Sequence, residues 1–214
     1  MNHGTLNLII GLAMGLNLLA LGSSRLPSLI RTVAVQGMAL GVMPLLMETH
    51  FDWMVALVAV GTVAGKGFVI PHLLRRAMRA ANIDREVEPF LGFVPSLLLG
   101  AGGTIAAVAM ARALPLLPEH AGSLLVSGSV ASVLTGFILL IGRAKAISQV
   151  CGYLILENGI YLFGLLLIQA TPLLVEAGIL LDLTVGIFVI GIIVDRIQRA
   201  FDSLDTRKLT VLRE

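Results

Sequence analysis

The sequence has few charged residues, few aromatic residues and a single cysteine. Of its 214 residues, 13% are charged, 5% are aromatic and 57% are hydrophobic. Its mean hydropathy is +0.96, whereas a typical soluble domain carries about 25% charged residues. This composition excludes an ordinary soluble domain and indicates a protein that crosses the membrane several times.

The scarcity of cysteine excludes several kinds of site. Cys151 alone cannot form an internal disulfide, a cysteine metal cage or the ligand set of an iron–sulfur cluster. No glycine-rich phosphate-binding loop is present either, and almost no sequence is left for a soluble domain. We therefore expect no cofactor, no metal and no catalytic residue in this chain. We expect Cys151 itself to be a small packing residue.

Long apolar runs account for most of the chain. About 20 apolar residues are needed for a helix to cross a bilayer. The sequence predicts an all-α, polytopic membrane helix bundle with seven transmembrane helices, at about 5–22, 28–48, 51–71, 89–111, 122–142, 148–170 and 173–194.

Basic residues predict the orientation of these helices. With the N-terminus outside, 13 of the 15 basic residues lie on the cytoplasmic side, together with the C-terminus, while Arg112 is external and Lys66 lies within a span. The net charge of +2 therefore reflects orientation in the lipid bilayer, and no nucleic-acid partner is implied. The leader before residue 5 has no Lys or Arg, so we expect a retained helix and not a signal peptide.

Two carboxylates lie at the middle of consecutive apolar runs. Glu157 and Asp182 are each the tenth residue of a predicted span, and consecutive spans run antiparallel, so both would lie near mid-membrane. A carboxylate there costs enough free energy to require a partner, water or a role. We expect the pair to load and release protons, with Tyr153 and Tyr161 placing hydroxyls on the face of Glu157. The alternative is that each carboxylate only hydrogen-bonds a neighbouring helix.

Four other polar residues are weaker candidates. Lys66 either extends its side chain to the headgroups or is buried and functional, beside glycines that imply a close helix neighbour. Gln36 is expected to be an interhelical hydrogen-bond donor more than an ion ligand. His72 is a solvated rim residue or a proton entry group. Glu176 is expected to be interfacial and structural, or alternatively an outer access group.

The chain divides into four predicted units. When spans one to three are laid over spans five to seven, Gln36 falls on Glu157. The two units would share one orientation, a parallel-repeat arrangement of the kind found in transporters. We assign a three-helix unit at 1–88, a connecting fourth helix with its external loop at 89–121, a second three-helix unit at 122–196, and a cytoplasmic tail at 197–214. The tail is either a contact segment or unstructured.

Three stretches carry a resemblance to a known family. The block GYLILENGIYLFGLLL, the block VEAGILLDLTVGIFVIGIIV and the tail SLDTRKLTVLRE are similar to the E-type membrane component of hydrogenase-4 and related formate hydrogenlyase complexes. GKGFVIP is also in place. Over its last three spans that family resembles the K subunit of respiratory complex I and the C subunit of multisubunit cation/proton antiporters. Glu157 then matches the mid-helix glutamate of the K subunit, Asp182 stands where the K subunit has a second glutamate, and Lys66 matches a lysine of the hydrogenase component.

The resemblance implies a role inside a larger complex. The expected function is that of a non-catalytic membrane subunit that relays protons, or Na⁺, within a complex I-related redox complex of a bacterial or archaeal cytoplasmic membrane. Its expected partners are antiporter-like membrane subunits and a peripheral hydrogenase-like arm. The alternatives are a subunit of a cation/proton antiporter, a stand-alone secondary transporter and a purely structural membrane anchor.

Overall fold

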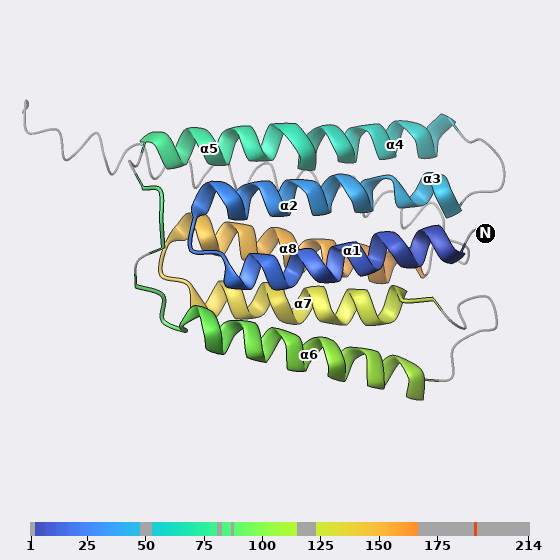
Figure 1. Cartoon of the computed structure of the whole chain (residues 1–214). Coiled ribbons are helices and arrows are strands. Elements are labelled where there is room, and N and C mark those ends of the chain that lie inside the picture. The colour runs from blue at the N-terminus through green and yellow to red at the C-terminus, as the bar shows by residue number, and fades with distance from the viewer. Residues whose placement is uncertain are drawn as a thin grey trace, which may run out of the picture.

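A computed structural model describes residues 3–47, 53–80, 83–86, 88–114, 123–166 and 191 of the chain. This part is all helical and contains no strand. Its long helices run side by side, alternating in direction, as one bundle (Figure 1). Five of them are long and apolar enough to cross a membrane, at Gly4–Gly22, Leu26–Met47, Val55–Arg79, Phe93–Ala113 and Leu125–Gly142.

The first two spans confirm the predicted positions closely. Helix α1 covers His3–Gly22, and the second span consists of α2, Leu26–Gly41, followed by the short helix α3, Met43–Met47. The two pieces are separated at Val42, two residues before Pro44. A proline lacks the N–H that would continue the helical ladder, so Pro44 accounts for this break.

The third helix differs from the prediction. It continues from α4, Trp53–Ala64, through a π-helical turn η1, Gly65–Val69, into α5, Ile70–Ala80. The helix therefore continues past Pro71, where the predicted span ends. In a regular α-helix the Pro71 ring would clash with the carbonyl of Gly67, but the wider turn that precedes it removes this constraint. Lys66 consequently lies about midway along the continuous helix.

The remaining described helices are α6, Phe93–Ala113, α7, Leu125–Gly142, and α8, Ala146–Leu165. Helix α8 corresponds to the sixth predicted span but is not among the five apolar candidates, because polar residues such as Gln149 and Glu157 interrupt it. The predicted seventh span, 173–194, and the tail lie outside the described residues. The division into four units also stays a prediction.

Helices α7 and α8 make the closest helix contact of the described core. A Cβ atom built on Gly136 would lie 2.6 Å from the backbone nitrogen of Leu156, and one on Gly159 would lie 2.7 Å from that of Val133. Only glycine permits such an approach, as small residues do between membrane helices. The contact places α8 inside the bundle, where α2 and α5 also pack against it.

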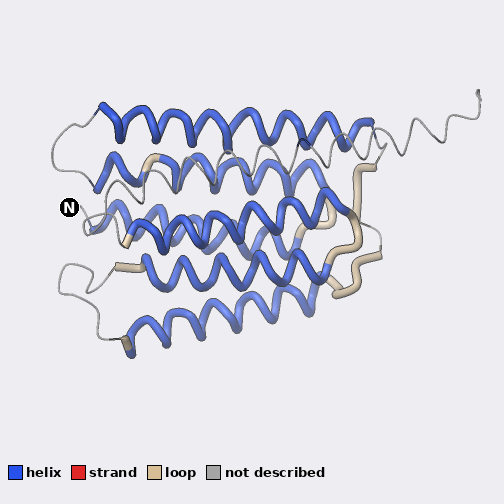
Figure 2. The backbone as a smooth tube through the Cα atoms, turned by 180° about the vertical axis from the view of Figure 1, so that it is seen from behind, coloured by secondary structure: helices blue, strands red, loops and turns tan. Residues whose placement is uncertain are grey.

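Buried charges hold one end of the bundle together. The Glu86 carboxylate accepts hydrogen bonds from the backbone of Ala144 and Lys145 and, at 2.6 Å, from Ser148 Oγ, and so caps the N-terminus of α8. Arg143 donates to the carbonyls of Leu21 and Leu91. Burial lowers the pKa of Arg143 below its ordinary value, and the charge of Glu86 partly offsets this effect. The short described connections at this end are visible in Figure 2.

The glycine contact between α7 and α8 yields the first prediction. Gly136→Ala forces a methyl group against the backbone of α8, so we expect a lower thermal unfolding midpoint, corresponding to about 1–3 kcal/mol of stability. Gly102→Ala in α6 is the matched control, because a Cβ there meets nothing within 4 Å. We expect it to leave stability unchanged or slightly raised. Equal midpoints for the two variants in detergent would contradict the close packing of α7 and α8.

Candidate functional site

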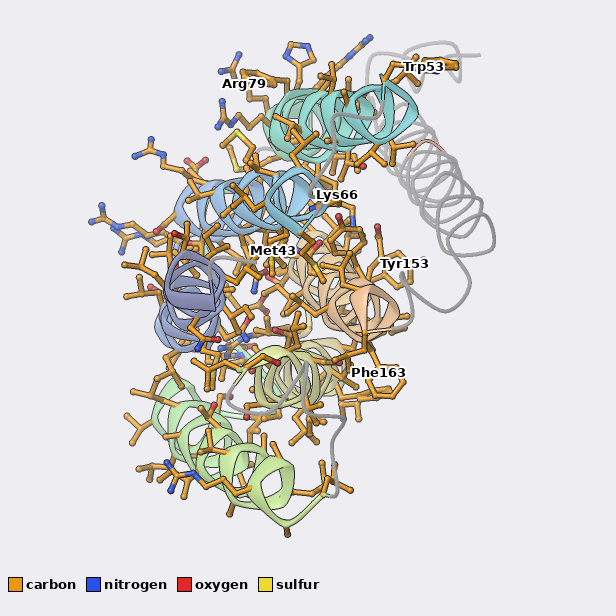
Figure 3. All side chains as sticks on the ribbon, turned by 90° about the vertical axis from the view of Figure 1, so that its right-hand side faces the viewer. Met43, Trp53, Lys66, Arg79, Tyr153 and Phe163 are labelled. Atoms are coloured by element: carbon orange, nitrogen blue, oxygen red, sulfur yellow. The ribbon has the colours of Figure 1, made fainter. Side chains whose placement is uncertain are left out.

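Lys66 and Glu157 form a buried ion pair in the described bundle. Lys66 Nζ lies 2.6 Å from Glu157 Oε1, and the two side chains are only 7% and 2% exposed. Viewed down the helices in Figure 3, Lys66 lies among the helices of the bundle while Arg79 and Trp53 lie at its periphery. The pair connects η1 with α8 and joins two residues that are far apart in the sequence.

Local backbone features bring Lys66 to this position. The π-helical turn Gly65–Val69 offsets its side chain from the regular α-helical register. On the facing helix, a Cβ at Gly37 would lie 2.8 Å from Lys66 Cβ, so only glycine allows α2 to approach this closely. Together the two features place the stem of the lysine against α2 and its ammonium against α8.

Asn158 and Tyr161 complete the surroundings of the ammonium. Lys66 Nζ donates a 3.0 Å hydrogen bond to Asn158 Oδ1 and lies 5.5 Å from the centre of the Tyr161 ring, within the range of a cation–π contact. Helix α8 thus supplies a carboxylate, an amide oxygen and an aromatic face from one turn. The Tyr161 hydroxyl has no hydrogen-bond partner among the described residues.

From Asn158 a chain of hydrogen bonds continues across the bundle. Asn158 Nδ2 donates to Gln36 Oε1 at 3.2 Å, Gln36 Nε2 donates to Asn17 Oδ1 at 2.8 Å, and Asn17 Nδ2 donates to Ser132 Oγ at 2.9 Å. Every member is at most 1% exposed. The chain therefore links α8, α2, α1 and α7 at the level of the ion pair.

The structure places four of the predicted site residues in one cluster. It brings Glu157, Lys66, Gln36 and Tyr161 together. Of the two alternatives for Lys66, the structure shows the buried one, because its ammonium pairs with Glu157 inside the bundle. Tyr153 is half-buried.

The other predicted site residues are His72, Asp182 and Glu176. His72 is exposed on α5, two turns before the end of that helix. Asp182 and Glu176 lie outside the described residues. The carboxylate pair of Glu157 and Asp182 therefore stays a prediction.

Sequence reasoning missed three residues of the site: Asn17, Asn158 and Ser132. Asn17 and Asn158 carried a usable signal, since each is an amide near the middle of an apolar run, where an unpaired polar group is costly. Ser132 carried none, because several hydroxyls of the fifth run are equivalent in the sequence.

The chemistry available at the site is proton transfer between a carboxylate and an amine. Lys66 Nζ and Glu157 Oε1 are 2.6 Å apart, an ion-pair contact short enough for a proton to pass between the two groups. In the described part of the chain no three His, Cys, Asp or Glu residues gather as a possible metal site.

Comparison with known proteins identifies relatives of the chain. An uncharacterized protein of Mycobacterium tuberculosis, Rv0085, is 37% identical over 192 residues, which cover 88% of this chain and 87% of that protein. The chain belongs to the family of this mycobacterial protein. No family model matches the chain, and no solved structure matches it significantly.

The chain is more distantly related to hydrogenase-4 component E. Hydrogenase-4 component E of Escherichia coli K12 and of Shigella flexneri is 27% identical over 150 residues, which cover 69% of this chain and 68% of that protein. With the five apolar helices of spanning length in the described part of the chain, this relationship fits a multi-pass membrane subunit. It also agrees with the resemblance carried by the C-terminal sequence blocks.

The second prediction concerns the energetics of the ion pair. Lys66→Met leaves the Glu157 carboxylate buried without its cation, and removing one partner of a buried pair costs about 3–5 kcal/mol. We expect Lys66→Met and Glu157→Gln each to lower the unfolding midpoint. The double variant should lose clearly less than the sum, because no unpaired charge remains. Additive losses would show that the two side chains do not interact.

Proposed function

We propose that this chain is a membrane subunit of a redox complex related to hydrogenase-4 and that Glu157 and Lys66 relay protons within it. The distant relationship to hydrogenase-4 component E supports the first part. The second part rests on one observation, the short contact between Glu157 and Lys66 in an apolar bundle. Na⁺ is the other ion that such a subunit would carry.

The pair suits a relay because its two partners control each other's charge. While Glu157 is ionised, the Lys66 ammonium compensates its charge and lowers the cost of burial. When Glu157 takes up a proton, the site gains one positive charge, which favours release of a proton onward. A group that alternates in this way passes protons without performing catalysis itself.

Energy for directed transport would come from partner subunits. The chain has a single cysteine and no phosphate-binding loop, so we propose that redox centres reside in a peripheral hydrogenase-like arm and that antiporter-like membrane subunits adjoin this chain. Asp182 would be the next carboxylate of the relay. Apart from Lys66 and Arg112, the described basic residues are carried by segments at one end of the bundle (Figure 1). We propose that this end is cytoplasmic.

A purely structural anchor is the second candidate function. It is favoured by the amide chain from Asn158 to Ser132, which joins four helices by hydrogen bonds as interhelical links in a membrane do. Under this reading the ion pair of Lys66 and Glu157 only fastens η1 to α8.

The third prediction separates these functions. In the assembled complex in vesicles, we expect Glu157→Gln to abolish proton movement coupled to the redox reaction, because the amide cannot take up and release a proton. Glu88→Gln is the control, since that carboxylate is exposed, and we expect it to have no effect. Assembly is checked by co-purification of the other subunits.

Other results would support different functions. Normal proton movement and turnover in an assembled Glu157→Gln complex would overturn the relay and leave the structural anchor. Proton or cation transport by this chain reconstituted alone would instead indicate a stand-alone transporter. Assembly with antiporter subunits and no hydrogenase arm would indicate a cation/proton antiporter.

A further inference from the structure

The hydrogen-bond chain beside the ion pair has a single direction. In Asn158, Gln36 and Asn17 the amide oxygen accepts from the neighbour nearer Lys66, while the amide nitrogen donates to the neighbour farther away. The three amide dipoles are therefore aligned, with their negative ends toward the ammonium. Hydrogen bonds arranged in series polarise and strengthen one another.

The alignment matters because the charge of Glu157 is not constant in a relay. When Glu157 is protonated, the ammonium of Lys66 loses its compensating carboxylate and remains in an apolar bundle. The oxygen of Asn158 and the ring of Tyr161 are its other described contacts, at 3.0 Å and 5.5 Å. Both are neutral, so their geometry and orientation decide whether the ammonium stays in place.

We propose that Asn17, Gln36 and Asn158 are positioning residues that keep the Lys66 ammonium at the site while Glu157 gains and loses its proton. Asn158 contacts Lys66 directly, Gln36 orients the amide of Asn158, and Asn17 orients Gln36. This inference rests on the proposed relay for its purpose. The holding of Lys66 can be measured independently of any transport.

A second buried hydrogen bond provides a control that separates positioning of Lys66 from ordinary packing between helices. Ser129 Oγ donates a 2.7 Å hydrogen bond to the carbonyl of Gly159, which is also buried and also links α7 to α8. This bond is not a member of the amide chain. Ser129→Ala therefore removes an interhelical hydrogen bond of comparable burial without interrupting the chain, and serves as the matched control.

The fourth prediction uses Glu157→Gln as a mimic of the protonated site. The chain has three lysines, Lys66, Lys145 and Lys208, so ¹⁵N-lysine labelling gives few signals, and Lys66→Met assigns one of them. With ¹³C-labelled asparagine, solid-state NMR of the full chain in lipid reports the contact between Lys66 Nζ and the Asn158 side chain. We expect this dipolar coupling in the native chain and in Glu157→Gln.

Second substitutions in the Glu157→Gln background test the chain of amides. Gln36→Met, which keeps the side-chain length but has no amide, should abolish the coupling. Asn17→Leu should weaken it less, because Gln36 Nε2 keeps its 3.3 Å bond to the carbonyl of Ala13. Ser129→Ala should leave it unchanged. Unfolding midpoints verify that each variant is folded, and Asn17→Leu carries the test if Gln36→Met does not fold.

Two results would overturn the proposal. The first is loss of the coupling in Glu157→Gln alone, which would mean that the amides cannot hold the ammonium. The second is a coupling in Gln36→Met or Asn17→Leu equal to that in Ser129→Ala. Neither result depends on transport, so failure of the relay in vesicles and failure of the positioning array are separate outcomes.

Discussion

A buried ammonium paired with a buried carboxylate is the constraint on which the rest of this bundle depends. Moving Lys66 and Glu157 from water into an apolar interior costs several kcal/mol per ion, and their attraction offsets this cost only with close geometry and additional hydrogen bonds. The described structure supplies both, through the 2.6 Å contact and the bond from Lys66 to Asn158. The neighbouring helices must therefore lie at the positions where these contacts can form.

Several local irregularities serve this requirement at the same level of the bundle. The π-helical turn at Gly65–Val69 offsets the lysine from the α-helical register, and Gly37 lets α2 lie against its stem. On the other side, Gly159 brings α7 against α8 next to the glutamate. Each feature weakens an isolated helix, through a poorer hydrogen-bond pattern or the flexibility of glycine. Their common location is explained by the close packing that the ion pair needs.

The positions of most described helices along the chain were predictable, because apolar length and composition are local properties. Glu157, Lys66 and Gln36 were also recognisable as candidates, since a polar residue inside an apolar run stands out without any structure. The partner of each was not predictable. Pairing Glu157 with Lys66 depends on the rotation of two helices about their axes, and the π-helical turn changes that rotation. The same π-helical turn lets the helix continue through Pro71, which the sequence did not reveal.

The sequence by itself determined that this chain forms apolar helices of membrane-spanning length and that a few of them carry polar residues at depth. Apolar composition and run length suffice for that conclusion, because they set the transfer free energy of each segment separately. Only the tertiary structure decided that the carboxylate of α8 meets a lysine and that three amides align behind it. Those contacts join residues of four different helices, and their geometry follows from how the helices pack, which no single segment encodes.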